Sequence, residues 1–350
     1  MVMNSDTPRN DAFLRACHCE PVDHIPVWYM RQAGRYQPEY REIKKTRRLI
    51  DIVTDPELCA QVTILPVDQL NVDAAILFSD IIMPITPMGI AFEIRDGVGP
   101  CLDTPIREEA HVKRLSVPDF VAEMPYVSET IHILRNQLSV PLIGFCGAPF
   151  TLACYLVEGG PSKHFTHVKR TIHGNPDMWN ALMEVLTAGM AAYLRFQADC
   201  GAQALQIFDS WVGTLGVVDY RSHVLPYLTR LVAEVKRHVD VPIIYFGVQT
   251  GHLLESIAES GCDVIGLDWR VSIADARRRV PANIALQGNL DPGLLLGPWV
   301  VLEAHAKSIL DQIDAPGFIF NLGHGVTPQT PVESLHKLTQ FVHNYTKSRS

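Results

Sequence analysis

Eight short apolar runs, separated by segments of helical period, constrain the fold of this chain more than any other feature. The runs are residues 25–30, 73–78, 141–146, 204–208, 241–246, 264–268, 284–287 and 318–322. Strands that are apolar on both faces belong to parallel sheets covered by helices, and eight of them predict a (β/α)8 TIM barrel. The alternative is an open doubly wound sheet, which usually carries a Gly-x-Gly-x-x-Gly turn after its first strand. This chain contains no such turn.

The chain has 350 residues, whereas a barrel of this kind typically needs about 250. We expect residues 1–24 to form an N-terminal extension with a short helix, and residues 25–345 to form a single barrel domain. A β-hairpin inserted near residues 90–102 accounts for part of the surplus. Asp55-Pro56 predicts the start of a helix, because Asp caps a helix and Pro suits its first turn. Pro66 is expected to kink or end that helix.

Charge and cysteine usage limit the partners and the compartment. The formal net charge of −8 argues against a nucleic acid or an anionic membrane as partner. The eight Cys form no Cys-x-x-Cys pair, which indicates a reducing compartment. The N-terminus has no apolar signal segment, and prolines and Ser79-Asp80 interrupt the most apolar region. We therefore predict a cytoplasmic protein.

Three arginines follow the first predicted strand, at Arg31, Arg35 and Arg41. Arginine binds carboxylate or phosphate with two parallel hydrogen bonds and stays charged at physiological pH. The Ala33-Gly34 step between the first two lets backbone N–H groups turn toward an anion as well. A solvated basic loop is the alternative, and the remaining polar positions favour an anion-binding loop.

Catalytic groups of a barrel lie at the carboxyl ends of its strands, and polar residues gather there in this sequence. Asp80 is either a functional carboxylate or a cap, and Ser210 either a ligand contact or a turn residue. His324 lies between two glycines, which favours a ligand contact over core packing, whereas Tyr155 taken alone is expected to pack. Two further acidic strand ends are expected to bond neighbouring loops: Asp209 and Asp268.

Several of these segments, taken together and in order, resemble the uroporphyrinogen decarboxylase family. The resemblance covers about residues 10 to 340, and no single motif carries it. The matching segments are Met30-Arg-Gln-Ala-Gly-Arg-Tyr36, Phe78-Ser-Asp80, Leu142-Ile-Gly-Phe145, Gly147-Ala-Pro149, Tyr155-Leu-Val-Glu-Gly-Gly160, Gly201-Ala-Gln-Ala-Leu-Gln-Ile-Phe-Asp-Ser210, Gly266-Leu-Asp-Trp269, Leu286-Gln-Gly-Asn-Leu-Asp-Pro292 and Asn321-Leu-Gly-His-Gly325.

The resemblance implies a homodimeric enzyme of haem biosynthesis that uses no cofactor and no metal. Such an enzyme converts the four acetate side chains of uroporphyrinogen III to methyl groups and gives coproporphyrinogen III. By the same resemblance Asp80 contacts the pyrrole N–H groups, and Asp80 and Arg31 are catalytic. The implied substrate-binding residues are Arg31, Gln32, Ala33, Gly34, Arg35, Asp80, Tyr155, Ser210 and His324.

Two alternatives belong to other classes. Zinc-dependent corrinoid methyltransferases resemble this family in fold, but they use a His-x-Cys pair at a late strand end. This chain has His324-Gly-Val326 there. A non-catalytic tetrapyrrole carrier would bind the macrocycle without releasing CO₂, and it would have little use for an aspartate among arginines.

Overall fold

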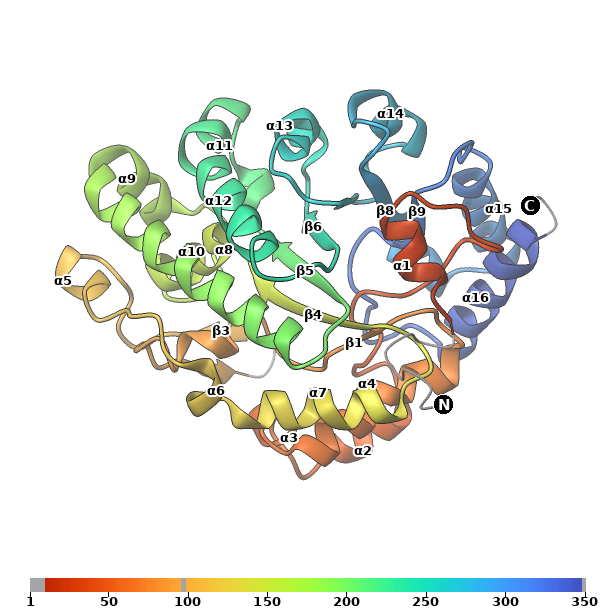
Figure 1. Ribbon diagram of the computed structural model, residues 1–350, viewed down its shortest axis with the longest axis horizontal. Helices are drawn as coiled ribbons and strands as arrows, with labels where there is room; N and C mark the ends of the chain where they lie inside the picture. The colour runs from red at the N-terminus through yellow and green to blue at the C-terminus, as the bar shows by residue number, and fades with distance from the viewer. Residues whose placement is uncertain (1–9, 96–98, 348–350) are drawn as a thin grey trace.

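Seven parallel strands form one curved sheet in the order β1-β4-β5-β6-β7-β8-β9, with helices around its outer side (Figure 1). The computed structural model describes residues 10–95 and 99–347. The strands are β1 (Ala75–Ile76), β4 (Leu142–Gly147), β5 (Ala204–Asp209), β6 (Ile243–Gly247), β7 (Val264–Gly266), β8 (Ala285–Leu290) and β9 (Phe318–Leu322). Each strand pairs in parallel with the next one along the sheet, which is the arrangement that the buried apolar runs predict.

Residues 26–30 lie between β9 and β1 and fill the eighth position of the barrel. On the β9 side, the Trp28 N–H donates to the Phe320 carbonyl at 3.3 Å. On the β1 side, the Asp73 N–H donates to the Val27 carbonyl at 2.7 Å. The segment therefore joins both edges of the sheet, and the predicted TIM-barrel fold is confirmed.

The prediction of a regular strand in this closing segment was wrong. The structure has a single parallel bridge there, between Val27 and Phe320. Side chains accept the hydrogen bonds that a neighbouring strand would otherwise take. The Val27 N–H donates to Asp73 Oδ2 at 2.7 Å, and the Met30 N–H donates to Asn321 Oδ1 at 3.1 Å. These acceptors replace ladder partners, so no continuous ladder forms.

Helices form the outer layer of the barrel. The longest, α10 (Pro176–Asp199), begins after Asn175, whose Oδ1 accepts from the Met178 N–H at 3.2 Å. Asn175 therefore caps this helix. The other α-helices are α1 (Ala12–Cys17), α2 (Pro38–Lys44), α3 (Leu49–Val53), α4 (Pro56–Leu70), α5 (Glu109–Val112), α6 (Phe120–Glu123), α7 (Pro125–Gln137), α8 (Pro149–Glu158), α9 (Thr166–Gly174), α11 (Val217–His223), α12 (Leu225–Lys236), α13 (Leu254–Ala258), α14 (Ile273–Arg279), α15 (Trp299–Leu310) and α16 (Val332–Lys347). Short 3₁₀ turns are η1 (Met83–Ile85), η2 (Val212–Thr214), η3 (Gly251–Leu253) and η4 (Pro292–Leu296).

Helix α4 begins where the sequence predicts and continues further than predicted. Its cap is Asp55, whose Oδ1 accepts from the Leu58 N–H at 3.2 Å. Pro66, where we expected a kink or an end, lies inside the helix, which ends at Leu70 and is followed by Asn71 in the left-handed conformation with φ of 54°. Pro66 lies on the buried face of the helix. Packing of that face compensates for the backbone hydrogen bond that proline cannot donate.

The predicted hairpin is confirmed as β2 (Glu93–Arg95) and β3 (Gly99–Cys101). The two strands are antiparallel, with Glu93 opposite Cys101 and Arg95 opposite Gly99. The turn that joins them, residues 96–98, lies outside the described residues. The hairpin leaves the barrel between β1 and β4, so it is an insertion and not part of the parallel sheet.

Helix α1 closes the amino-terminal end of the barrel. Its Phe13, Ala16 and Cys17 are buried in one cluster with a residue from each of the eight positions around the sheet. Those residues are Trp28, Ala74, Ile143, Ala204, Ile244, Val264, Ala285 and Ile319. The predicted helix in the N-terminal extension therefore exists, and it packs apolar side chains across the starts of the strands.

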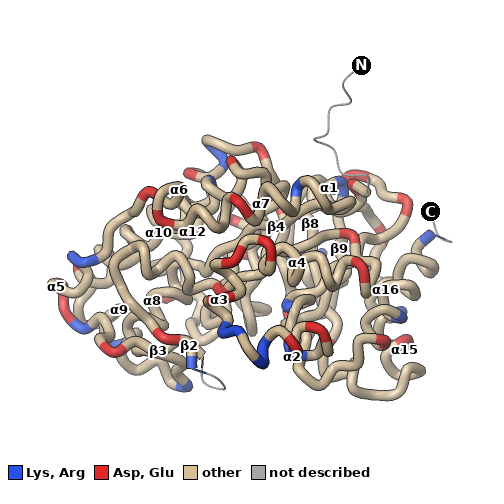
Figure 2. The backbone as a smooth tube through the Cα atoms, turned by 90° about the horizontal axis from the view of Figure 1, so that it is seen from below, with Lys and Arg blue, Asp and Glu red and all other residues tan. Residues whose placement is uncertain are grey.

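Charged residues of both signs are distributed over the outer helices, as Figure 2 shows, with basic positions close together after α2. Among the described residues, none of the helices is both long enough and apolar enough to cross a membrane.

Candidate functional site at the carboxyl ends of the strands

Arg31 follows the closing segment in the left-handed backbone conformation, with φ of 60°. This conformation is uncommon for a residue with a side chain and costs on the order of 1–3 kcal/mol. The Arg31 side chain passes next to Gly325, where an added Cβ would lie 2.4 Å from Arg31 Cδ. Glycine at position 325 therefore leaves the space that the arginine stem occupies, which explains one of the two glycines beside His324.

The loop after Arg31 is held by its own polar groups. Gln32 is fully buried; its Oε1 accepts from the Tyr29 N–H at 3.1 Å and its Nε2 donates to the Ala74 carbonyl at 3.1 Å. The Gly34 N–H donates to Gln37 Oε1 at 3.0 Å. The side chain of Gln32 and the amide of Gly34 are thus engaged in the loop itself.

The three arginines of the cluster have different positions. Arg41 Nη1 donates to the carbonyls of Arg35 and Tyr36, at 3.1 and 3.0 Å, and so fixes the end of the loop. Arg35 is exposed to solvent. Arg31 is also exposed, and its charge acts on Asp80 and His324 at two other strand ends.

Asp80 is half-buried after β1, and its Oδ1 accepts from the Ile82 N–H at 3.1 Å. Burial raises the pKa of the Asp80 carboxyl, because an apolar environment disfavours its charge. The Ile82 N–H and the Arg31 guanidinium oppose this rise. The Arg31 charge therefore reaches Asp80 after the end of β1.

Tyr155 on α8 lies close to both of these residues. Burial raises the pKa of the Tyr155 hydroxyl to about 12, and the Asp80 charge contributes, whereas Trp211 and Arg31 oppose it. The Tyr155 ring meets the Trp211 ring edge to face, with centroids 5.8 Å apart. Ser210 directly precedes Trp211 at the end of β5 and is half-buried. These contacts place Tyr155 and Ser210 at the same end of the barrel as Asp80.

His324 completes this group of predicted residues. Burial lowers the pKa of its imidazole, and the Arg31 guanidinium lowers it further. Its ring meets Trp269 edge to face at a centroid distance of 6.5 Å. Arg31 thus acts on the pKa of Asp80, Tyr155 and His324 together.

Arg270 is a further guanidinium at this end of the barrel, and the sequence analysis did not single it out. Its Cζ lies 3.9 Å from the centre of the Trp269 ring, and its Nη1 pairs with Asp268 Oδ2 at 3.0 Å. Arg270 also lowers the pKa of His324, after burial and Arg31. Arg270 could have been identified from the sequence, because it directly follows the segment Gly266-Leu-Asp-Trp269 at a predicted strand end.

Asp209 and Asp268 have the structural roles that the sequence predicts. Asp209 accepts from Thr151 Oγ1 at 2.6 Å and from the Tyr245 hydroxyl at 2.8 Å. Burial raises the pKa of Asp209 to about 6, although both donors oppose the rise. Asp268 accepts from the Arg270 N–H at 2.9 Å. Asp209 thus joins helix α8 to strand β6, and Asp268 holds the loop that follows its own strand.

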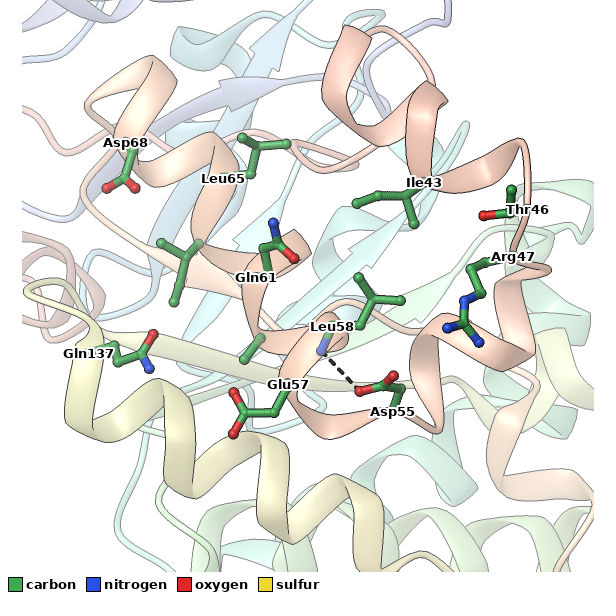
Figure 3. A pocket seen from close by; sticks show the side chains of 12 residues that line it. Ile43, Thr46, Arg47, Asp55, Glu57, Leu58, Gln61, Leu65, Asp68 and Gln137 are labelled. Atoms are coloured by element: carbon green, nitrogen blue, oxygen red, sulfur yellow. Dashed lines mark hydrogen bonds between the residues drawn. The ribbon is translucent and has the colours of Figure 1, made fainter.

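A separate hollow of about 770 Å³ lies on the outer side of the molecule, between α2, α3, α4 and the end of α7 (Figure 3). Its wall includes Ile43, Arg47, Leu58 and Gln61. It contains no residue of the predicted site, and it is open to solvent between the outer helices.

Comparisons with known proteins agree with this geometry. The family model "Uroporphyrinogen decarboxylase (URO-D)" matches residues 8–345. A protein named uroporphyrinogen decarboxylase from Halalkalibacterium halodurans is 52% identical, over 96% of this chain and 97% of that protein. A protein of the same name from Bacillus cytotoxicus is 50% identical, over 97% and 98%. Among solved structures, a methyltransferase from Methanosarcina mazei superimposes with a TM-score of 0.80 at 20% identity, covering 97% of this chain and 99% of that one, which shows a common fold.

Proposed function

Because this chain belongs to the uroporphyrinogen decarboxylase family, we propose that Asp80 and Arg31 are the catalytic residues of its decarboxylation reaction. The chain is a carboxy-lyase that removes CO₂ from the four acetate side chains of uroporphyrinogen III and gives coproporphyrinogen III. The observation that supports this assignment is that the Arg31 charge acts on the pKa of Asp80, Tyr155 and His324, which come from three other segments of the chain.

The reaction needs an electron sink, because a carbanion on the acetate methylene is too unstable to form. Protonation of the neighbouring pyrrole carbon makes the ring cationic, and the C–CO₂ bond electrons flow into that cation as CO₂ leaves. A second proton converts the resulting exocyclic methylene to a methyl group, and the ring carbon then releases the first proton, which restores the neutral aromatic pyrrole. The substrate thus supplies the electron sink, and we propose that no cofactor takes part.

Asp80 would stabilise the ring cation from the side of the pyrrole N–H groups. A preorganised charge in a site without bulk water commonly contributes a few kcal/mol to the transition state. Bound pyrrole N–H groups would donate to the carboxylate and reverse the rise in the pKa of Asp80 that burial causes. Asp80 would then be ionised during the reaction.

Arg31 would hold the acetate that reacts, and its charge would attract the carboxylate that leaves as CO₂. A guanidinium with a pKa above about 12 does not release its proton in the protein. We therefore propose that a water molecule or a carboxylic acid group of the substrate, bound to Arg31, delivers the proton to the ring.

The remaining carboxylates of the macrocycle need further cations and donors. We propose Arg35, Tyr155, Ser210 and His324 as substrate contacts, with Arg270 as an additional cation near His324. Gln32, Ala33 and Gly34 would contribute by shaping the loop that carries Arg31 and Arg35, since Gln32 and Gly34 already bond within that loop.

We also propose that the enzyme is a homodimer in the cytoplasm, as the family likeness suggests. Multi-angle light scattering after size-exclusion chromatography tests the oligomeric state. A mass of twice 39.0 kDa supports the dimer, and a mass of one chain contradicts it.

The direct test incubates the purified protein with uroporphyrinogen III under reducing, anaerobic conditions and separates the products by carboxyl number. We expect products with seven, six, five and four carboxyl groups, at a rate that prior treatment with a chelator leaves unchanged. A zinc-dependent enzyme would lose its activity after chelation. A carrier would bind the macrocycle and release no CO₂, and either result would contradict the proposal.

A further inference from the structure

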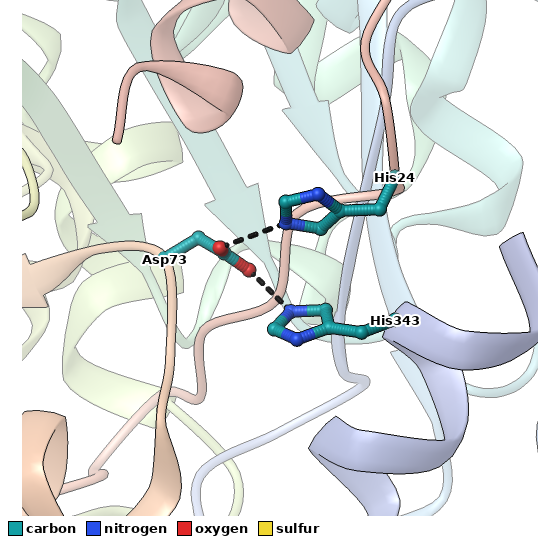
Figure 4. Close-up of side chains that lie close together, drawn as sticks. All are labelled: His24, Asp73 and His343. Atoms are coloured by element: carbon teal, nitrogen blue, oxygen red, sulfur yellow. Dashed lines mark hydrogen bonds and ion pairs between the residues drawn. The ribbon is translucent and has the colours of Figure 1, made fainter. Parts of the chain in front are cut away.

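Two groups of histidine and aspartate lie outside the proposed active site in the part of the chain that the structure describes. The first, which we name the buried clasp, consists of His24, Asp73 and His343 (Figure 4). The second, which we name the surface triad, consists of His173, Asp219 and His223. In each group the possible ligand atoms lie within 4.8 Å of one another, but the two groups differ in whether an ion fits.

The buried clasp is saturated by hydrogen bonds. Asp73 Oδ1 accepts from His24 Nε2 at 3.0 Å and from Asn10 Nδ2 at 2.6 Å. Asp73 Oδ2 accepts from His343 Nε2 at 2.7 Å and from the Val27 N–H at 2.7 Å. A carboxylate offers about four lone-pair positions, and four donors fill them here. No lone pair of Asp73 is left for a cation.

The surface triad is open. Asp219 and His223 lie one turn apart on α11, so their side chains project from the same face of the helix. His173 comes from the last turn of α9, and its Nε2 is 3.7 Å from Asp219 Oδ2. This separation is too long for a hydrogen bond. It is close to the distance of about 3.3 Å between two ligands of a tetrahedral zinc ion with bonds of about 2.0–2.1 Å.

We propose that the surface triad is a zinc site formed by His173, Asp219 and His223. Two imidazoles and a carboxylate are a common ligand set for this ion, and water takes the fourth position where a site is open. The side chains of His173 and Asp219 are 57% and 37% exposed, so they can rotate by the small amount that closes the set around an ion. No metal in the decarboxylation reaction is implied.

The surroundings support a defined ligand position for His223. Its carbonyl accepts from Trp179 Nε1 at 3.2 Å, which fixes the end of α11 against the buried side of α10. The rings of His173 and His223 lie edge to face, with centroids 6.0 Å apart. Helices α9 and α11 are neighbours in the outer layer (Figure 1). A bound ion would therefore link two helices of the outer wall, far along the chain from both Arg31 and Asp80.

Isothermal titration of the chelator-treated full-length protein with ZnCl₂ tests the site. We expect one ion per chain, with affinity at least tenfold weaker in His173→Ala, His223→Ala and Asp219→Asn. His167→Ala is the matched control, because His167 lies on the same helix α9 outside the triad, and it should bind as the wild type does.

A second measurement distinguishes zinc binding at the surface triad from zinc binding at the cysteines or at the buried clasp. Zinc should raise the melting temperature of the wild type and of His167→Ala, but not that of His173→Ala, because a ligand stabilises only the fold that binds it. Binding that is equal in the wild type and in all three triad variants would overturn the proposal, as would the absence of binding at 100 μM zinc. Circular dichroism checks that each variant is folded.

Discussion

Asp73 and Asp80 lie on either side of β1, and the two carboxylates have opposite surroundings. Burial raises the pKa of Asp73, but hydrogen bonds from His24 and His343 outweigh it and hold that pKa well below its usual range. Asp80 accepts one described backbone hydrogen bond, from Ile82, and its pKa is raised. At the amino end of the barrel, buried charge is fully compensated by the protein. At Asp80, at the carboxyl end, it is not, and a ligand with N–H groups would complete it.

This difference in hydrogen bonding corresponds to a difference in role between the two aspartates. Asp73 joins the segment of His24, the start of β1 and helix α16, so its bonds maintain the closure of the barrel. Asp80 holds little of the fold together. A residue with unsatisfied bonding capacity in a half-buried position reduces stability and favours function, which is the usual exchange at active sites.

The largest effect is expected from Asp73→Ala. It leaves four donors in the buried clasp without their acceptor, and each buried donor left unsatisfied costs about 1–3 kcal/mol. Urea unfolding of Asp73→Ala and wild type measures the difference. Because the folded-state pKa of Asp73 is lowered, its contribution is complete above the ordinary pKa of about 3.9 and is lost as pH falls through the folded value. Asp103→Ala, at a position that is 96% exposed, is the control and should change stability little.

The next effect is expected from Asp80→Asn, in kcat. The amide keeps the shape but removes the charge that we propose for the ring cation, which should lower kcat by about 10²–10³-fold with substrate binding retained. Since burial raises the folded-state pKa of Asp80, its charge costs stability at neutral pH, and Asp80→Asn should melt at the same temperature as wild type or higher. A near-normal kcat would contradict the catalytic role of Asp80.

A smaller effect, confined to KM, is expected from Arg35→Ala. Arg35 is exposed, and we propose that it binds peripheral carboxylates in both ground and transition states. Loss of such uniform binding raises KM and leaves kcat unchanged, here by roughly tenfold, as for a hydrogen bond to a charged group. Steady-state kinetics with uroporphyrinogen III measures both constants. A fall in kcat alone would assign Arg35 to the chemical step.

The smallest effect is expected from Gly325→Ala. The added methyl group would lie 2.4 Å from Arg31 Cδ, which is closer than two non-bonded carbon atoms can approach. The arginine side chain must therefore shift to make room for it. We expect kcat/KM to fall a few-fold, because small misplacements of catalytic groups are costly. Gly216→Ala is the matched control, since nothing lies within 4 Å of its added Cβ. Equal activities of the two variants would show that the position of Arg31 is not critical.

Strand ends were the part of the site that the sequence could predict. Asp80, Ser210 and His324 each follow an apolar run, and parallel strands end at one face of a barrel. The residues that hold Arg31 could not be predicted in this way. Its left-handed φ and its packing against Gly325, far away in the chain, depend on the closed barrel.

The same reason explains the wrong strand prediction at residues 25–30. An apolar run reads as a strand because side chains alternate between buried faces. The competing acceptors of its N–H groups, Asp73 and Asn321, come from distant parts of the chain. The local sequence therefore cannot predict that these side chains take the place of hydrogen-bond partners from a neighbouring strand. The arginine cluster was ambiguous for a similar reason, since Arg41 bonds the loop backbone and does not face the other strand ends.

Helix α1 has a consequence for turnover, because Phe13 and its neighbours fill the amino end of the barrel. The macrocycle must then arrive and depart by the same entrance. With one proposed Arg31–Asp80 pair for four acetate arms, the ring either rotates while bound or leaves and returns between rounds. Adding an excess of fresh substrate during turnover would test this, because a ring that leaves would accumulate in solution as a partly decarboxylated intermediate.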